Sequence, residues 1–434
     1  MYIPCVAPSD MRRRLNLLKS IVTARDQVMS FRLSTLLAAP HRLPFLTGAL
    51  NLVVLMFWWC VTLIDLHICS VGLAPSELPT SLLHAPIMLY LLLPPFFFGF
   101  LLTVFPRWMG YADLVVRQYA PIGIAFLIAS ALAWIGLFGG ALPILIVAFA
   151  LAASGWLVTL WQLFALIRAE RRDGKGPTWH AWSVFAALVL GLGGLVLLLL
   201  FLIGHDSRLV QAANLIGTFG LLVPVFTTVA HRMIPFFAGN VVKDYVHWRP
   251  FWVLAALWIL LITHLALELF GLKNWLWVSA LGLAGLTGLM LRRWWPSASA
   301  PGLLRVLLWG FAWAPAGFAL IAADSGARIA GLNFSLGRAP VHALYIGMAG
   351  SMLIAMVTRV TQGHAGRPLE MPWVAWIAFC GIQLSAVARI IAGMREEQGN
   401  WLVLAALIWL LSVLPWVFRQ VRIYGAPRID GKPG

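Results

Sequence analysis

The sequence predicts an all-α fold, a polytopic bundle of about twelve transmembrane helices with both termini in the cytoplasm. Hydrophobic residues make up 61% of the 434 residues and charged residues only 11%, whereas a soluble domain needs about 25% charged residues. Apolar runs of about 20 residues recur, and each can cross a ~30 Å hydrocarbon core as a helix. The net charge of +16 comes from basic residues in the gaps between these runs, so we expect a lipid bilayer as partner and exclude nucleic acid.

Residues 1–40 form the first predicted segment, which is basic and cytoplasmic. It contains the run Arg12-Arg13-Arg14 with Lys19 and Arg25, and it has no apolar core followed by a small-residue cleavage site. We therefore expect an amphipathic segment on the inner leaflet rather than a signal peptide.

Residues 41–420 form the predicted transmembrane domain, in which short polar or basic gaps separate the apolar runs. The first six runs are 45–65, 82–105, 120–139, 142–167, 181–203 and 211–236. The last six runs are 251–270, 275–291, 303–323, 340–360, 372–394 and 401–419. The Gly-Gly-Ala-Leu-Pro break at 139–143 is the weakest boundary, so eleven or thirteen spans are the alternatives. Residues 421–434 are predicted as a cytoplasmic tail that is frayed from Gly425 onward.

The distribution of lysine and arginine predicts the orientation. With twelve spans, 25 of the 31 basic residues fall on the side that holds both termini, which the positive-inside rule assigns to the cytoplasm. The other six lie on or near the outer side: Arg208, Lys273, Arg328, Arg338, Arg389 and Arg395.

Two histidines lie at matching depth near the outer ends of different spans. His84 opens the second span and His342 opens the tenth. If these spans are neighbours, the two imidazoles could hold one metal ion or haem iron, and a low-dielectric site favours the neutral, metal-binding imidazole. The alternative is that each is an interfacial histidine with its ring among lipid headgroups.

Three further histidines lie at one depth near the inner side. His41 precedes the first span, His231 ends the sixth and His364 follows the tenth. Together they could form a copper site or a haem axial position, and Gly363 with Gly366 would let the backbone leave the helix so that His364 turns inward. Alternatively they are three separate surface histidines.

The remaining histidines carry weaker signals. His67 and His205 are predicted in outer loops, His180 and His247 in inner loops beside tryptophans, and His264 as a helix-packing residue. We expect none of them in a metal site.

Three arginines suggest an internal repeat. Arg232 follows Arg107 by 125 residues, and Arg359 follows Arg232 by 127, each at an inner helix end. Three repeats of four helices would place spans two, six and ten around a common centre. Such a centre would bring His231 close to His364 and His84 close to His342.

Carboxylates are missing from the middle of the predicted spans. Asp65, Glu268 and Asp324 all fall near outer helix ends, whereas a proton- or sodium-coupled carrier usually needs a carboxylate in the membrane. This weakens the alternative of a twelve-helix secondary transporter without a redox cofactor. A structural partner of a respiratory complex is the third alternative.

Several stretches resemble the NnrS family, and they occur in the family's order along the whole twelve-helix body. They are Ala39–Gly48, Gly99–Trp108, His231–Phe237, His342–Gly347 and Met356–Leu369. The resemblance implies a multi-pass protein of the bacterial inner membrane that is associated with haem and copper and linked to nitric oxide metabolism and relief of nitrosative stress. It does not imply a defined reaction, so whether the chain is an enzyme stays open. A respiratory-chain partner and nitric oxide, or a related small molecule, are the partners it implies.

The residues carried over from this resemblance are histidines. His84, His342 and His364 match the family pattern, and His41 and His231 match a subset of members. Many members have His-Ala-His-Glu-Met where this chain reads His84-Ala-Pro-Ile-Met88, so two potential ligands are absent and haem is better supported than copper. The twelve helices are also similar to the catalytic subunit of haem–copper oxidases, but span seven lacks the adjacent histidine pair of that subunit.

The preferred interpretation is therefore a membrane haem protein. His84 and His342 would hold iron near the outer face, and His41, His231 and His364 would form an inner metal or haem site. Arg232, Arg359 and Arg367 could bind haem propionates at the inner site, or they could be cytoplasmic anchors alone.

Overall fold

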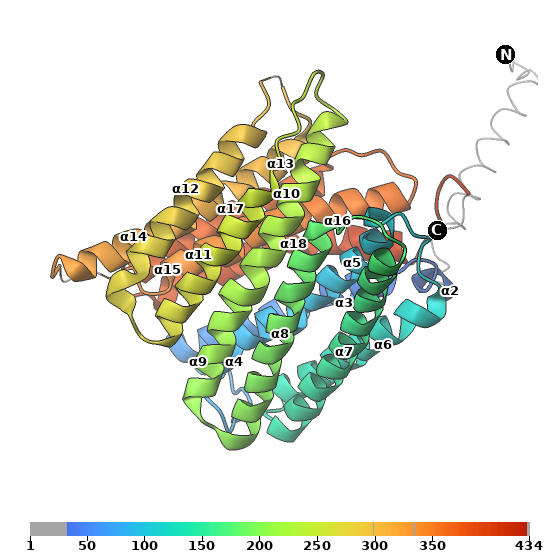
Figure 1. The fold of residues 1–434 in the computed structure, drawn as a ribbon. Coiled ribbons are helices and arrows are strands. Elements are labelled where there is room, and N and C mark those ends of the chain that lie inside the picture. The colour runs from blue at the N-terminus through green and yellow to red at the C-terminus, as the bar shows by residue number, and fades with distance from the viewer. Residues whose placement is uncertain (1–32, 298, 333–334, 432–434) are drawn as a thin grey trace, which may run out of the picture.

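The computed structural model describes residues 33–297, 299–332 and 335–431, and within these ranges the chain is helical and forms no strand. Twelve helices are long and apolar enough to cross a membrane, which confirms the predicted all-α bundle (Figure 1). Most of the basic N-terminal segment, residues 1–32, lies outside the described residues. The described chain begins with the short helix α2 (Leu33–Leu36).

The twelve spans follow the predicted order. The first six are α3 (Arg42–His67), α4–η1–α5 (Thr80–Ile87, Met88–Leu92, Pro94–Trp108), α6 (Val116–Phe138), α7 (Leu142–Arg172), α8 (Trp179–Gly204) and α9–η2–α10 (Ser207–Leu215, Ile216–Leu222, Val223–Gly239). The last six are α11 (Phe251–Leu269), η3–α12 (Lys273–Trp275, Leu276–Trp294), α13–α14 (Gly302–Phe311, Trp313–Ile329), α15–η4–α16 (Ala339–His342, Ala343–Gly350, Ser351–His364), α17 (Trp373–Gly393) and α18 (Gly399–Tyr424).

Several helices continue beyond their apolar runs into basic sequence. The helix α7 ends at Arg172 rather than near 167, and α18 ends at Tyr424 rather than near 419. Both last turns contain arginine, which is favourable beside the partial negative charge of a helix C-terminus. Hydropathy marks only the part of a helix that lies in hydrocarbon, so it places these ends too early.

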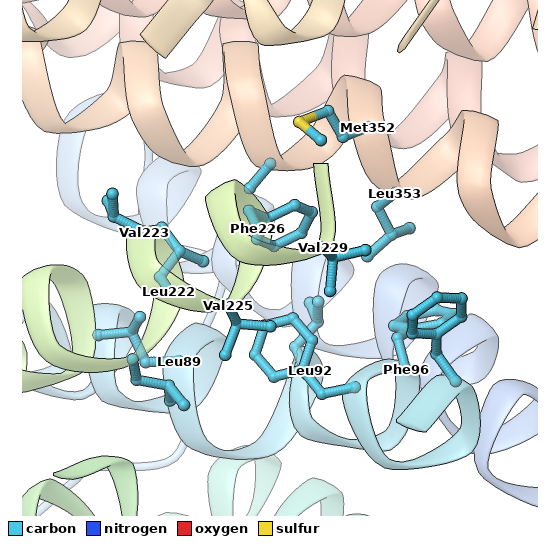
Figure 2. Close-up of a cluster of buried hydrophobic side chains, with 14 of the residues drawn as sticks. Leu89, Leu92, Phe96, Leu222, Val223, Val225, Phe226, Val229, Met352 and Leu353 are labelled. Atoms are coloured by element: carbon cyan, nitrogen blue, oxygen red, sulfur yellow. The ribbon is translucent and has the colours of Figure 1, made fainter. Parts of the chain in front are cut away.

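Spans two, six and ten form the centre of the bundle. In the most apolar window, 78% of spans two and ten and 67% of span six is buried, against at most 56% of any other span. Figure 2 shows side chains from all three meeting in one apolar cluster, among them Leu92, Val225 and Leu353. The predicted common centre is therefore present, while the threefold repeat itself stays a prediction.

Each of these three central spans contains a π-helical segment. They are η1 (Met88–Leu92), η2 (Ile216–Leu222) and η4 (Ala343–Gly350). Proline follows the first two, at Pro94 and Pro224, where its missing N–H removes a regular helical hydrogen bond. The wider turns of π segments often accompany functional sites, and η4 starts directly after His342.

The last part of the chain packs on the bundle. The Arg42 guanidinium donates to the carbonyl oxygens of Tyr424 and Ala426 at 3.3 and 2.8 Å, and the Ile429 amide donates to Ala365 at 3.1 Å. The expectation of a frayed tail is therefore wrong for residues 425–431. The start of α3 and the end of α18 meet at one end of the bundle, as an even number of spans requires (Figure 1).

Candidate functional site

The predicted outer pair, His84 and His342, lines a single cavity. His84 comes from α4 and His342 from α15, and Tyr345, Arg389 and the aromatic ring of Trp59 line the same space. The two histidines are 258 positions apart in the chain, and the central packing of spans two and ten brings them together. Their predicted adjacency is thus present in the structure.

The tautomer of His342 follows from its hydrogen bond. Its Nδ1 lies 2.7 Å from the carbonyl oxygen of Arg338, and because a carbonyl only accepts, Nδ1 must carry the proton. The neutral ring then keeps a lone pair on Nε2. A ring nitrogen fixed in this way by a backbone carbonyl is the usual support of a metal-binding histidine.

The His84 ring is held by stacking rather than by a hydrogen bond. It lies on Trp59 with 4.0 Å between ring centroids and 12° between planes. Its buried Nδ1 has no partner among the described residues, and the same holds for Nε1 of Trp409 on the cavity wall. A buried polar group without a hydrogen bond costs about 1–3 kcal/mol of stability. A polar ligand or a metal ion bound at this wall would remove that cost.

Arg389 gives the outer cavity a positive charge. It lines the cavity, and it forms no salt bridge with any residue in the described ranges. A guanidinium without a counter-ion suits a carboxylate, such as a haem propionate. About 110 Å³ of the cavity is open to a water-sized molecule. That is room for an ion with a small ligand, whereas a macrocycle needs flexible wall residues such as Met56 and Met88 to move.

A second cavity is lined by apolar side chains of spans one, two, six and ten. Figure 2 labels several of those from spans two, six and ten, among them Phe96, Phe226 and Met352. This cavity measures about 60 Å³. Leu353 lines both this cavity and the outer one. Phe45 also lines the second cavity, and its ring lies 5.5 Å from that of His41 between centroids. Apolar side chains therefore connect the outer histidines with the inner ones.

The inner pair consists of His41 and His364. Their ring centroids lie 4.6 Å apart, with 53° between the planes. His364 Nδ1 lies 3.0 Å from the Val360 carbonyl, so this nitrogen carries the proton. The buried Nε2 of His364 and Nδ1 of His41 have no partners within the described chain. Two imidazole nitrogens are thus available at one place.

Burial keeps His41 neutral. It lowers the pKa of His41 well below the usual 6.5, and the proximity of His364, Arg42 and Arg107 lowers it further. The neutral ring is the form that binds a metal ion.

A helix terminus positions His364. The Arg367 amide donates to the Gln362 carbonyl at 2.9 Å and the Gly366 amide to Gly363 at 3.4 Å, the pattern of a Schellman motif. Gly366 has φ of +69°, which a side chain would strain. The expected role in ending this helix is therefore confirmed for Gly366 and wrong for Gly363, which lies within α16.

The predicted grouping of His231 with His41 and His364 is wrong. His231 Nδ1 lies 2.9 Å from Nε2 of His180, and no three His, Cys, Asp or Glu side chains of the described ranges gather closely enough to hold a metal. His180 is not a loop residue as expected, because α8 already begins at Trp179 and buries it. The first turn of α8 thus supplies His180 as the partner of His231, and the hydropathy pattern did not reveal this.

Two glutamines lie near the inner end of the bundle, and of these the sequence pattern indicated Gln362, as a possible hydrogen-bond partner of an inner histidine, but not Gln420. Gln362 and Gln420 are fully buried, and neither atom of either side-chain amide has a partner in the described chain. Gln420 lies just beyond the predicted end of the last span, so only the length of α18 reveals it as buried.

The three arginines considered for propionates lie in different surroundings. Arg232 lies over the Trp108 ring at 4.7 Å and Arg359 over Phe237 at 3.8 Å, which are cation–π contacts. Arg367 lines a groove between α17 and α18 instead. Contacts with protein rings therefore already account for two of the three.

The sequence of this chain matches one protein family. A family model described as NnrS protein matches residues 35–428, a range that contains both histidine pairs and His231. No curated protein and no solved structure matches the chain.

Proposed function

Because the chain belongs to the NnrS family, we propose that it is a haem-binding protein of the bacterial inner membrane that acts in nitric oxide metabolism or relief of nitrosative stress. Copper is the second metal of this proposal. The family match supports the class of protein, and the two histidine pairs are the residues that we propose for its sites.

One observation carries the proposal: His84 and His342, from distant parts of the chain, line the same cavity. His342 directs a lone pair from Nε2 because Arg338 fixes its Nδ1 proton, and His84 has a buried nitrogen without a partner. Arg389 would bind a propionate there. When bound, a haem iron or copper ion would supply a coordination position for nitric oxide.

The inner pair is the proposed second site. His41 and His364 each offer one buried ring nitrogen without a partner, and imidazole suits copper as well as haem iron. The residues that would keep these rings in place are Phe45 for His41 and the Val360 carbonyl for His364. His41 and His342 are buried, and His84 and His364 are half-buried.

The visible absorption spectrum of the purified protein tests the haem. We expect a Soret band in the wild type that changes when nitric oxide is added, and a loss of most of that band in His84→Ala and His342→Ala. His67→Ala is the matched control, because His67 is an exposed histidine at the same end of the bundle as His84. A wild type without a Soret band would contradict the haem and favour the transporter alternative.

A further inference from the structure

A groove at the inner end of the bundle contains three arginines. Arg367, Arg419 and Arg422 line it together with Trp373 and Phe418, and its volume is about 580 Å³. None of the three guanidinium groups forms a salt bridge or a hydrogen bond with another residue of the described ranges. Glu370 acts on Arg419 only at longer range. The groove therefore has an uncompensated positive charge.

Two of these guanidinium groups have buried nitrogens. Nε of Arg367 and a terminal nitrogen of Arg419 are shielded from solvent without a hydrogen-bond acceptor in the described chain. Buried donors are normally satisfied, and an exposed arginine anchor would satisfy them with water. An acceptor of negative charge is the ligand that this arrangement lacks.

The start of α17 supplies further donors on the same wall. Pro372, Trp373 and Val374 line the groove, and the first intrahelical amide donors of α17 are Ala375 and Trp376, which both donate to Pro372. The amides of Trp373 and Val374 thus precede the helical hydrogen bonds. This 21-residue helix has no acidic residue in its first turn, so its N-terminus favours an anion, as in phosphate-binding sites.

Apolar side chains extend the groove toward the membrane. Trp373 and Phe418 are 69% and 59% exposed at its rim, and aromatic rings of this kind lie at the level of lipid headgroups. Further along the same two helices, Ile377 and Leu411 are exposed to the surroundings of the bundle. These surfaces can contact acyl chains while the arginines contact a headgroup.

We propose that this groove binds the phosphate group of an anionic phospholipid, with the arginines and the first turn of α17 around the phosphate and the acyl chains along α17 and α18. The positive-inside distribution places the groove at the cytoplasmic leaflet, where basic pockets between helices bind anionic headgroups. The proposal stands apart from the histidine sites and does not require a haem.

Thermal unfolding of the full-length protein in detergent tests the proposal, with added phosphatidylglycerol, phosphatidylcholine or inorganic phosphate. We expect phosphatidylglycerol to raise the Tm of the wild type, and the other two to leave it nearly unchanged. The double variant Arg419→Gln, Arg422→Gln should need roughly 25-fold more phosphatidylglycerol for the same shift, since each arginine near a headgroup contributes about five-fold in affinity.

Two variants control for general effects of charge and folding. Arg292→Gln removes an exposed arginine at the end of α12, outside the groove, and should respond like the wild type. Arg419→Lys keeps the charge and should retain most of the response, which shows that a folded protein is measured. An unchanged response in the double glutamine variant would overturn the proposal. A response to inorganic phosphate equal to that of the lipid would overturn the lipid as the ligand.

Discussion

His231 differs from His41 and His364 in the way its ring is used. Nδ1 of His231 shares a hydrogen bond with Nε2 of His180, whereas the rings of His41 and His364 lie against each other, with 4.6 Å between their centroids. Each of the three rings has one buried nitrogen without a partner among the described residues. A hydrogen-bonded pair of histidines stabilises the contact between α8 and α10. We infer that an inner metal would be held by His41 and His364, whose rings are neighbours, and that His231 stays paired with His180.

Metal analysis of purified variants tests this difference. His41→Ala and His364→Ala should each lower the bound metal by about one equivalent per chain at the inner site, because a single imidazole binds too weakly to retain it. His231→Ala should keep the metal content and lower the Tm instead, since it leaves His180 without its partner at a cost of about 1–3 kcal/mol. Equal metal loss in all three variants would contradict this inference and support the original prediction of a site formed by all three histidines.

At the level of single residues, the sequence predicted how deep each histidine lies in the bundle better than it predicted which neighbour its ring faces. His41, His84, His231, His342 and His364 were identified by their places at helix ends, and all five are buried or nearly so. The partners of each ring depend on how neighbouring helices are rotated, which a hydropathy pattern does not record. This is why the pairing of His231 with His180 could not be predicted.

At the level of elements, the end of α16 shows how a glycine can control a site. Gly366 has a positive φ, and a Cβ added there would lie 2.7 Å from the Asp430 carboxyl carbon. Gly363, one turn earlier, is within the helix, and the nearest atom to an added Cβ is 3.8 Å away. The two glycines therefore form a natural pair of test positions.

We expect Gly366→Ala to lower stability by about 1–2 kcal/mol, the usual cost of a left-handed conformation with a side chain, and to reduce the metal at the inner pair. Gly363→Ala should be neutral or slightly stabilising, since alanine is the better helix former. Tm values and metal content of the two variants side by side give the measurement. If Gly363→Ala were the more harmful change, the helix end would not be what positions His364.

The elements themselves were largely predictable, and their irregularities were not. The hydropathy pattern along the sequence predicts twelve apolar runs, and the structure has twelve membrane-length helices in the same order. The π segments at Met88–Leu92, Ile216–Leu222 and Ala343–Gly350 depend on how three central helices pack. Proline at two of these places is compatible with several local distortions, so the sequence does not specify a wide turn.

At the scale of the whole molecule, the orientation in the membrane is a prediction that a native cysteine can test. Cys69 is exposed and lies between the first two spans, Cys60 is buried, and Cys380 lies within α17. Loop 68–79 is predicted on the outer side, the same side as His84 and His342. A water-soluble reagent should therefore reach Cys69 from outside.

Labelling of intact spheroplasts with a membrane-impermeant maleimide gives the measurement. We expect labelling of the wild type, its loss in Cys69→Ser, and no change in Cys5→Ser, because Cys5 belongs to the predicted cytoplasmic segment. Labelling that requires broken membranes would reverse the topology. The outer histidine pair would then face the cytoplasm and the arginine groove the opposite leaflet.

The hydrogen bonds that end the described chain bear on how the protein is handled. Arg428 donates to the carbonyl oxygen of His364 at 3.0 Å, and the next residue, Ile429, is bound to Ala365. An affinity tag fused after Gly434 would start only a few residues along the chain from Ile429, which is bound beside His364. Purification through such a tag could strip the very metal that is sought, so a cleavable spacer or a handle in the loop 295–301 is the safer design.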